Sequence, residues 1–405
     1  MHILFLSHYF PPEVNAPASR TYENARRWVR DGHQVTVLTC VPNHPHGVVY
    51  PGYQNRWCQW ENVDGINVLR VITYLGPNKG FVRRIVNYLS YFFSASFFCS
   101  KVKNVDVVVS TSPQFFCGLA GFFVSRRLRV KWVLEIRDLW PESIVAVGAL
   151  RQQQIIRILE SIETFMYRQA NHIVTVTNSF LQHITARGID AGKLTVITNG
   201  ADLESFKPQP RDNEVTVKYG LRDKFVASFI GTHGMAHGLS TVLRAADRLR
   251  KDQRIVFLLV GDGAEKENLE RQAREMRLDN VVMIGQQPKK MMPLFLAASD
   301  VCLVLLRRDD LFKTVIPSKI FEAMAMARPI IMGVEGESWE IVKQADCGLA
   351  IEPENDLELT EAVVKLADNP KLVEKLGNNG RRFVAENYDR GKLAEMYLDV
   401  LKSQS

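Results

Sequence analysis

The feature that most constrains the fold of this chain is a repeated alternation between short apolar runs and longer segments of helical periodicity. The runs are nearly continuous in Val, Ile and Leu, which is typical of strands buried on both faces of a parallel sheet. Helical segments between them imply right-handed β-α-β units, so we predict an α/β protein. The predicted strands are Ile3–Ser7, Gln34–Thr39, Asn67–Val71, Val105–Ser110, Lys131–Glu135, His172–Val176, Leu194–Ile197, Phe225–Gly231, Arg254–Gly261, Asn280–Ile284, Val301–Leu305, Pro329–Gly333 and Gly348–Ile351.

The strands fall into two series, separated at Asp202–Asn213 by a segment that breaks both periodicities. A chain of 405 residues also exceeds what one hydrophobic core usually organises. We predict two Rossmann-like, doubly wound parallel-sheet domains that face each other across a cleft, with ligands beyond the carboxyl ends of the strands. The predicted bounds are residues 1–201 for the first domain, 202–213 for a linker, 214–382 for the second domain and 383–405 for a final helix.

The net charge of +7 is unevenly distributed along the chain. Residues 1–200 hold 21 Lys and Arg against 12 Asp and Glu, whereas residues 201–405 hold 30 against 32. Chance surface composition is one reading of the basic first half; an anionic membrane or anionic lipid-linked substrate is the other. The six cysteines show no C-x-x-C spacing, which favours reduced thiols in the cytoplasm over a disulfide framework or a zinc site.

Residues 78–103 form a helix candidate with aromatic residues in its middle and basic residues at both ends. Its uncharged stretch, Ile85–Ser100, is shorter than the roughly 20 residues that span a bilayer. Two readings stay open: a helix buried on the first sheet, or an interfacial helix with aromatics in lipid and basic residues at headgroups. We expect no transmembrane segment.

A Pro317-Ser318 pair followed by an apolar-periodic run predicts a helix whose first turn offers free amides to a phosphate. Ser318 adds a hydroxyl and Lys319 a positive charge. Glu322, one turn further, can accept two hydrogen bonds from a ribose diol. The alternative is a capped amphipathic helix with Glu322 at the surface.

Residues 311–333 resemble the nucleotide-binding signature of retaining GT-B glycosyltransferases of family 4. That signature has two glutamates with seven residues between them, and here the positions hold Thr314 and Glu322. The resemblance implies a ribose contact at Glu322 and a donor-sugar contact at Thr314, where this chain departs from Glu. Its Pro-Ser-Lys motif is similar to that of a subgroup in surface-polysaccharide and O-antigen synthesis.

Other segments are similar to the same family in order and spacing. The turn Ile197–Asp202 resembles the one that closes the first domain, and Val260-Gly261-Asp262-Gly263 resembles a glycine turn of the second sheet. The family precedent also implies that Gly285 and Gln286 hold the base through backbone groups. It further implies that a final helix, Phe383–Lys402, crosses back onto the first domain.

The loop Gly231–Gly238 has Thr232 and His237 where the family has Arg and Lys. The diphosphate would then be neutralised by His233 and His237 as donors, or by Lys319 in their place. Alternatively, both histidines only line a glycine loop. No Asp-x-Asp pair accompanies them, so we expect neither a catalytic metal nor a cofactor.

Two segments of the first half are candidates for the acceptor side. The loop Ser7–Arg20 resembles the family's acceptor-facing loop, with Asn15, Ala16 and Pro17 in place of glycines. At the end of the strand Lys131–Glu135, Asp138 could orient or deprotonate an acceptor hydroxyl and Arg137 could bind an acceptor phosphate. A plain Arg–Asp structural pair is the alternative. With His237, these two are the candidate catalytic residues.

The resemblance implies transfer, with retention, from a nucleoside diphosphate sugar, with a UDP-linked N-acetylated deoxyhexosamine the expected donor. Family precedent favours front-face attack assisted by the departing phosphate. The expected acceptor is a polyprenyl-diphosphate-linked saccharide at the inner face of a bacterial membrane, reached through residues 78–103, with no nucleic-acid partner. Two alternatives stay open: a sugar-nucleotide 2-epimerase of the same architecture and a catalytically silent scaffold.

Overall fold

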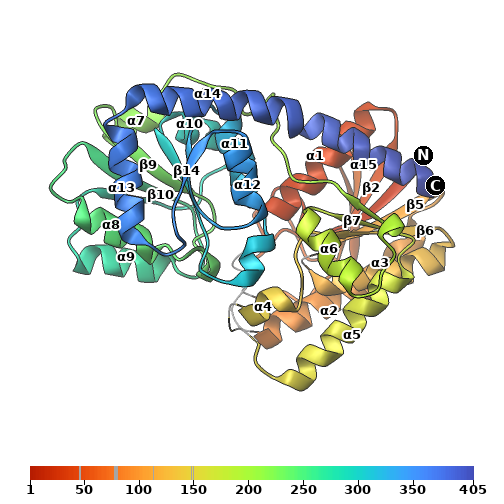
Figure 1. Ribbon diagram of the computed structural model, residues 1–405. Helices are drawn as coiled ribbons and strands as arrows, with labels where there is room; N and C mark the ends of the chain where they lie inside the picture. Colours follow the sequence, from red (N-terminus) through yellow and green to blue (C-terminus); the bar gives the residue numbers. More distant parts are fainter. Residues whose placement is uncertain (45–46, 77–80, 113, 147, 149) are drawn as a thin grey trace. The chain divides into compact units, whose positions relative to one another are not determined.

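The computed structural model describes the 405-residue chain except residues 45–46, 77–80, 113, 147 and 149. The chain forms two compact units (Figure 1). Unit 1 consists of Met1–Thr198 and Gly391–Ser405, and unit 2 consists of Asn199–Arg390. Unit 1 therefore ends at Thr198, a few residues before the expected domain bound at 201. The chain re-enters unit 1 at Gly391, after the expected start of the final helix at 383.

Unit 1 is built on an eight-stranded sheet with the order β3-β4-β2-β1-β5-β6-β7-β8. Neighbouring strands are parallel except β3, which is antiparallel to β4. The edge strand β3 was not predicted, because polar and exposed residues interrupt it. The strands are β1 (His2–Leu6), β2 (Gln34–Cys40), β3 (Cys58–Val63), β4 (Ile66–Val71), β5 (Val107–Thr111), β6 (Lys131–Ile136), β7 (His172–Thr175) and β8 (Leu194–Val196).

One face of this sheet is covered by the helices α1 (Ala16–Arg30) and α15 (Arg390–Gln404), which come from opposite ends of the chain (Figure 1). The indole of Trp28 donates a 2.9 Å hydrogen bond to the carbonyl of Ala394. Its ring lies 5.4 Å from that of Tyr397 in a T-shaped arrangement. Aromatic burial of this kind dominates core energetics, so the last helix is part of the core of unit 1.

The other face of the first sheet carries α3 (Phe115–Leu128), which packs on β5 and β6 between α2 (Phe81–Phe98) and α5 (Gln153–Gln169). The predicted helix over 78–103 is therefore found from Phe81, and its residues 78–80, including Lys79, lie outside the described part. The remaining short elements of unit 1 are η1 (Cys99–Lys101), α4 (Glu142–Ala146), α6 (Asn178–Ala186) and η2 (Ala191–Lys193).

Unit 2 is built on a six-stranded parallel sheet with the order β11-β10-β9-β12-β13-β14. The chain runs outward from β9 to β11 and then returns to the other side of β9. In such sheets ligands bind beyond the carboxyl ends of the strands at this reversal, here between β9 and β12. The strands are β9 (Phe225–Ile230), β10 (Ile255–Val260), β11 (Val281–Ile284), β12 (Val301–Leu305), β13 (Ile330–Gly333) and β14 (Gly348–Ala350).

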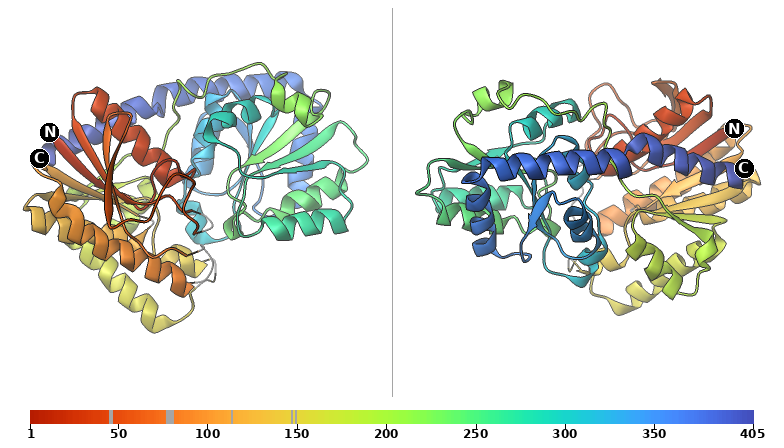
Figure 2. Two further views of the ribbon diagram at one scale, coloured as in Figure 1. Left: turned by 180° about the vertical axis from the view of Figure 1, so that it is seen from behind. Right: turned by 45° about the horizontal axis from the view of Figure 1, so that its top comes forward.

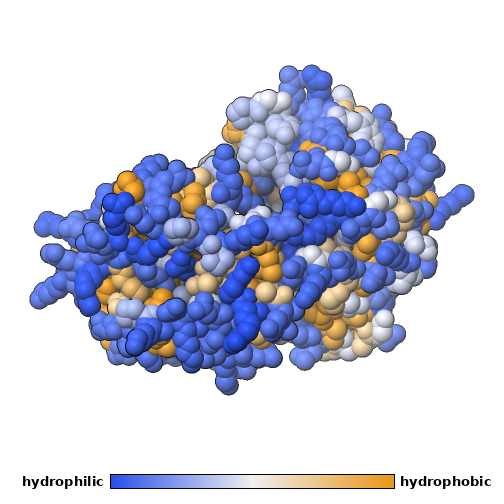
Figure 3. All heavy atoms as spheres, turned by 90° about the horizontal axis from the view of Figure 1, so that it is seen from above, coloured by the Kyte–Doolittle hydropathy of each residue, from blue (hydrophilic) through white to orange (hydrophobic). Residues whose placement is uncertain are grey.

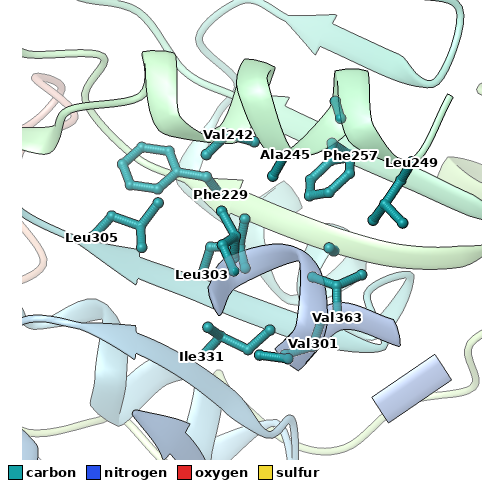
Figure 4. Packing of buried hydrophobic residues seen from close by; sticks show 14 of the residues in the cluster. Phe229, Val242, Ala245, Leu249, Phe257, Val301, Leu303, Leu305, Ile331 and Val363 are labelled. Carbon is teal, nitrogen blue, oxygen red and sulfur yellow. The ribbon is translucent and has the colours of Figure 1, made fainter. Parts of the chain in front are cut away.

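Apolar side chains alternate between the two faces of the second sheet, and both faces are buried. On one face, Phe229 and Leu303 point toward side chains of α8 and α13 (Figure 4). On the other, Val226 and Leu258 pack with side chains of α7 and α10. The helices of unit 2 are α7 (Glu214–Lys218), η3 (Met235–His237), α8 (Ser240–Arg248), α9 (Lys266–Glu275), η4 (Lys289–Met291), α10 (Met292–Ala297), η5 (Asp310–Thr314), α11 (Lys319–Ala325), α12 (Glu337–Gln344), α13 (Asp356–Ala367) and α14 (Pro370–Asn387).

The predicted single helix Phe383–Lys402 is wrong, because the chain breaks between α14 and α15. This break can be followed in the blue ribbon of Figure 2. Ala201 donates a backbone hydrogen bond to the carbonyl of Tyr388 and accepts one from the amide of Arg390, each 3.0 Å long. These bonds and a parallel bridge between Ala201 and Asp389 replace helical hydrogen bonds.

In the part of the chain that the structure describes, no helix combines the length and the apolar character needed to cross a bilayer. The face of the molecule drawn in Figure 3 is covered mainly by hydrophilic side chains, with apolar ones in small separate patches.

Candidate functional site

Two glycine loops meet at the carboxyl ends of β9 and β10 in unit 2. The amide of His233 donates to the carbonyl of Asp262, and the amide of Glu265 donates to the carbonyl of His233, each at 2.9 Å. Gly261 has a φ of +150°, and a Cβ there would overlap the carbonyl oxygen of Gly231. Glycine is therefore required for this contact, which fixes both loops at the edge where ligands bind.

His237 connects this edge to β12 on the other side of the reversal point. Its Nδ1 lies 3.1 Å from the carbonyl oxygen of Leu305, so Nδ1 carries the proton and donates it. Burial, followed by the neighbouring Lys319, lowers the pKa of His237 to about 3. The neutral ring therefore presents Nε2 as an acceptor and carries no charge in this structure.

His233 is completely buried below the same loop. Neither of its ring nitrogens has a hydrogen-bond partner among the described residues. Burial, followed by Lys319 and Lys266, lowers the pKa of His233 to about 4. Burial and nearby lysines therefore keep both histidines neutral in this structure, and the choice between the histidines and Lys319 as the partners of a diphosphate stays a prediction.

Lys319 reaches the same edge from the start of α11. Its Nζ lies 3.4 Å from the centroid of the Phe229 ring and is buried without a hydrogen-bond partner in the described part of the chain. Burial lowers its pKa to about 7, although Glu322 opposes the shift. A Cβ on Gly231 would lie 3.1 Å from this nitrogen, so glycine leaves room beside the ammonium. Lys319 thus lies at the reversal point with Glu322 as a nearby carboxylate, but with no hydrogen bond or ion pair to it among the described residues.

Glu322 lies one turn after Lys319 on α11 and is partly exposed. Burial raises the pKa of Glu322, and the nearby Lys289 and Lys319 oppose the shift. Among the described residues, no protein donor forms a hydrogen bond to its carboxylate. The side chain is therefore held close to two lysines, with acceptor oxygens still available to a ligand.

The first turn of α11 differs from its prediction. The amides of Ile320 and Phe321 are already bonded to the carbonyls of Pro317 and Ser318, at 3.1 and 3.2 Å. These tight turns satisfy amides that were expected to be free for a phosphate. The Ser318 side chain makes no capping hydrogen bond to this helix. Two of the first-turn amides are therefore used within the turn, and Lys319 adds a charge to what this segment offers an anion.

The remaining predicted donor residues lie at the same carboxyl edge with differing exposure. The hydroxyl of Thr314 donates to the carbonyl of Leu311 at 2.6 Å, and Thr232 is exposed in the loop after β9. Gly263 approaches the backbone of His233 too closely for a Cβ. Gly285 and the exposed Gln286 follow β11 directly.

In unit 1, a buried ion pair lies beneath the carboxyl edge of its sheet. Arg20 donates from Nε to Glu135 at 2.8 Å, and the Thr111 hydroxyl donates to the other oxygen of Glu135 at 2.7 Å. Burial by itself would raise the pKa of Glu135, but Arg20 and Arg137 hold it below its ordinary value. Arg20 and Glu135 were missed as site residues, although a lone carboxylate in a buried apolar strand signals such a pair.

Arg137 follows β6 next to this ion pair, and its backbone amide donates to the Ser112 hydroxyl at 3.0 Å. Its Nε and Nη1 are buried without a hydrogen-bond partner in the described residues. The structure therefore gives no support to the alternative of a purely structural ion pair between Arg137 and Asp138. Burial lowers the pKa of Arg137 to about 10. Arg137 is therefore a second cation near Glu135, and two of its nitrogens have no hydrogen-bond partner among the described residues.

Burial raises the pKa of Asp138 to about 6, although hydrogen bonds from the Ser143 side chain and the Leu139 backbone oppose the shift. A carboxyl group with such a pKa exchanges its proton near neutral pH. Asn15 caps α1 by accepting a 2.9 Å hydrogen bond from the amide of Ala18, and Ala16 and Pro17 form the first turn. Asn15, Ala16 and Pro17 therefore have a clear structural role.

Comparison with known proteins assigns both units. Residues 15–200 match the model described as glycosyl transferase 4-like domain, and residues 213–383 match the model described as glycosyl transferases group 1. This chain is a glycosyltransferase. The transferase has 28% identity over 295 residues to WbjE of Pseudomonas aeruginosa, described as a probable glycosyltransferase, covering 71% of this chain and 72% of the relative.

The transferase is also 23% identical over 416 residues to WcaI of Escherichia coli K12, whose name assigns it to colanic acid biosynthesis as a glycosyl transferase. That match covers 99% of this chain and 100% of the relative. Among solved structures, Anabaena HepE in complex with UDP-glucose superposes with a TM-score of 0.73 at 16% identity over 100% of both chains. The two units are therefore the two domains of the GT-B fold.

Proposed function

We propose that this glycosyltransferase moves a sugar from a UDP-linked donor to a lipid-linked saccharide, with retention at the anomeric carbon. The observation that carries the donor part is the pair formed by Lys319 and Glu322. A buried ammonium without a hydrogen-bond partner among the described residues and a carboxylate with available oxygens lie one helical turn apart, at the reversal point of a Rossmann-like sheet.

In this proposal the Lys319 ammonium faces the diphosphate of the donor. A diphosphate would supply the anion that this buried nitrogen lacks and would hold the lysine in its charged form. The same charge would then stabilise the diphosphate as the glycosidic bond to it breaks. Neutral His237 would contribute its Nε2 as an acceptor for a donor hydroxyl, because its Nδ1 proton is already used by Leu305.

Glu322 is proposed to accept two hydrogen bonds from the ribose diol. Hydrogen bonds to a charged carboxylate are worth about 1.5–3 kcal/mol each, which is enough to select a nucleotide over a free sugar phosphate. Thr314 is proposed to face the donor sugar, and backbone groups at Gly285 and Gln286 the base. The complex of the structural neighbour HepE with UDP-glucose supports uridine as the base.

On the acceptor side, Asp138 and Arg137 are proposed to act together at the end of β6. Asp138 has a pKa of about 6, so it can take the proton of an acceptor hydroxyl. Arg137 can hold a phosphate, because two of its nitrogens have no partner in the described residues. Retention would follow from attack on the face that the diphosphate leaves, without an enzymic nucleophile and without a metal ion.

The proposed acceptor is a polyprenyl-diphosphate-linked saccharide, which places the enzyme at the inner face of a bacterial cytoplasmic membrane. The names of its relatives, which include colanic acid biosynthesis and lipopolysaccharide core biosynthesis, support surface-polysaccharide synthesis. An N-acetylated deoxyhexosamine is the proposed sugar. O-antigen or capsule assembly is the proposed process.

A donor screen tests this proposal. The enzyme is incubated with UDP-linked and GDP-linked sugars, with and without acceptor extracted from membranes, and the products are analysed by mass spectrometry and anomeric NMR. We expect a saccharide lengthened by one residue, an α-linkage from an α-linked donor, and UDP release that requires acceptor. UDP release without acceptor would instead indicate a 2-epimerase, and the absence of nucleotide binding would indicate a scaffold.

A further inference from the structure

Helix α2 of unit 1 is apolar on the side that faces solvent as well as on the side that faces the sheet. Tyr91 is buried against the strands and donates a hydrogen bond to the carbonyl of Leu38 at 2.7 Å. On the opposite side, Val86, Phe93 and Phe97 are exposed, with Phe93 at 65% and Phe97 at 66% of their surface. Spacings of seven and four residues place these three on one helical face, where a soluble helix normally carries polar residues.

The exposed aromatic residues continue from α2 onto α3 and α5, which lie side by side with it (Figure 1). The rings form an unbroken series of contacts: Phe93 with Phe92 at 5.0 Å, Phe92 with Phe123 at 5.3 Å, Phe123 with Phe122 at 5.2 Å, and Phe122 with Phe165 at 5.1 Å. The exposed apolar residues of the three helices, three of them in this ring series, are called the aromatic surface: Val86, Phe93, Phe97, Phe123, Ile158 and Phe165. A contiguous exposed patch of this kind marks an interaction site.

Positive charge is concentrated around the aromatic surface. Residues 81–131 contain eight Lys and Arg but one acidic residue, Asp106, so this segment alone accounts for the net charge of +7 of the whole chain. The Asp106 carboxylate is already occupied, since it accepts a 2.6 Å hydrogen bond from the amide of His2. The basic residues are Arg83, Arg84, Lys101, Lys103, Arg126, Arg127, Arg129 and Lys131.

A cavity of about 320 Å³ opens beside the aromatic surface, where α2 continues into η1 and α3 ends. Its polar lining consists of Ser100, Lys103, Asn104 and Arg127. Both cations are exposed, so they can turn toward a ligand. Two cations and the Asn104 amide match the oxygens and the charge of a phosphate. The Ser100 hydroxyl donates to the carbonyl of Phe97 at 3.3 Å, so the cavity adjoins the helix end that carries Phe97.

We propose that unit 1 docks on an anionic phospholipid bilayer through α2, α3 and α5. The aromatic surface enters the boundary between headgroups and acyl chains, and the cavity of Lys103 and Arg127 holds a lipid phosphate. A bilayer fits better than a protein because lysine is depleted from protein interfaces, whereas the excess of basic residues over 81–131 complements anionic headgroups. This inference deepens the membrane location in the proposed function and does not depend on the donor chemistry.

Vesicle co-sedimentation of the full chain tests the proposal. The probes are vesicles of phosphatidylglycerol mixed with phosphatidylcholine, and vesicles of phosphatidylcholine alone. The first variant, Phe93→Ser/Phe97→Ser, removes exposed rings; the second, Lys103→Glu/Arg127→Glu, reverses the charge of the cavity. Val217→Ser is the matched control, because Val217 is an exposed apolar residue of α7 in unit 2.

The wild type and the control are expected to bind the phosphatidylglycerol vesicles at low salt, and both test variants to bind them at least about tenfold more weakly. Binding to phosphatidylcholine alone is expected to be weak for every protein. Unchanged binding by both test variants, or no binding by the wild type, would overturn the proposal. So would self-association of the wild type that Phe93→Ser/Phe97→Ser abolishes without any effect on vesicle binding.

The same proteins are tested for UDP binding by calorimetry. Normal UDP binding by the two variants shows that unit 2 is intact. The substituted side chains of unit 1 are exposed, so the circular dichroism spectrum and thermal unfolding of the variants should match the wild type, which checks that unit 1 is folded. Vesicle binding without UDP binding in the wild type would contradict the proposed function and leave the membrane surface standing. UDP binding without vesicle binding in the wild type would contradict the membrane surface and leave the proposed donor binding standing.

Discussion

The ammonium nitrogen of Lys319 lies 3.4 Å from the centre of the Phe229 ring. Phe229 is near the carboxyl end of β9, the edge of the unit 2 sheet where the donor is proposed to bind. The aromatic face partly compensates a buried positive charge that has no hydrogen-bond partner among the described residues. Burial still lowers the pKa of Lys319 to about 7. The lysine is therefore close to equal populations of its charged and neutral forms at physiological pH, and an arriving diphosphate can decide between them.

The first prediction concerns proton uptake. Above pH 7 the free enzyme holds Lys319 mostly neutral, whereas bound diphosphate favours the ammonium, so UDP binding must take up a proton. We expect close to one proton per UDP at pH 8 and much less at pH 6. Calorimetry in buffers of different ionisation enthalpy measures this number. Lys319→Met is the reference, because any proton taken up by UDP itself appears equally in both proteins and can be subtracted. Equal proton uptake by the wild type and the variant would show that the proton does not go to Lys319.

The second prediction concerns stability. The pKa of Lys319 is lower in the folded protein, about 7, than in the unfolded chain, where it has the ordinary lysine value of 10.5. Between these two pH values the unfolded chain binds more protons at this site than the folded protein. The free energy of unfolding therefore rises with pH in that window. Lys319→Met removes the cost of the buried charge. We expect it to stabilise the unliganded protein at pH 6 by about 1 kcal/mol, with a smaller gain at pH 9.

Urea denaturation at the two pH values checks this stability difference. Lys371→Met, which changes an exposed lysine of α14, serves as the control and should have little effect. A loss of stability in Lys319→Met at pH 6 would mean that the ammonium is paired in solution.

The third prediction concerns the ribose. Glu322→Ala should weaken UDP binding at least about tenfold, which corresponds to roughly 1.4 kcal/mol, because two hydrogen bonds to a carboxylate are lost. The same variant should bind 2′,3′-dideoxy-UDP as the wild type does, since that ligand lacks both hydroxyls. Equal weakening for the two ligands would show that Glu322 acts on the fold or on Lys319 instead.

The fourth prediction concerns the contact between the two glycine loops. Gly261→Ala places a Cβ on the carbonyl oxygen of Gly231 and forces a side chain into a φ of +150°. We expect a loss of about 2–4 kcal/mol in the stability of unit 2. Gly220→Ala is the control, because its φ of +66° costs about 1 kcal/mol but no atom lies within 4 Å of the added carbon. Thermal unfolding of both variants would show whether the overlap or the φ angle dominates.

The fifth prediction concerns Arg137. If its unpartnered nitrogens hold an acceptor phosphate, Arg137→Met should raise the KM for acceptor at least about tenfold with the KM for donor unchanged. Arg137→Lys should recover part of the loss, because it restores the charge without the fork of donors. Initial rates at varied acceptor measure this, with Arg30→Met as the surface control. A change in the KM for donor alone would indicate that Arg137 contacts the donor and not the acceptor.

Most strands could be predicted from the sequence because they are buried on both faces. In β10, Ile255–Val260, every residue is apolar and buried, so the pattern alone marks a parallel strand. The edge strand β3, Cys58–Val63, carries Gln59, Glu61 and Asn62, and only its pairing with β4 makes it a strand. The break between α14 and α15 was also invisible, because the partner of Tyr388 is Ala201, far away in the sequence.

The candidate site was predictable in its residues but not in its charges. Lys319 and Glu322 follow a Pro-Ser start in a recognisable spacing, which a local pattern can reveal. The neutral state of His237 depends on the carbonyl of Leu305, and the unpartnered state of Arg137 depends on Arg20 having taken Glu135. Contacts of this kind join distant parts of the chain, so no local pattern contains them.

The placement of α15 on the first sheet has a consequence for protein synthesis. Leu393, Tyr397 and Leu401 belong to the same buried cluster as Ile3 and Phe5. The ribosome makes these residues only after the whole of unit 2, so the earliest strands remain without one of their covering helices while unit 2 is translated. Unit 2 can therefore fold before unit 1 is complete, and the N-terminal strands need protection from aggregation until α15 has been made.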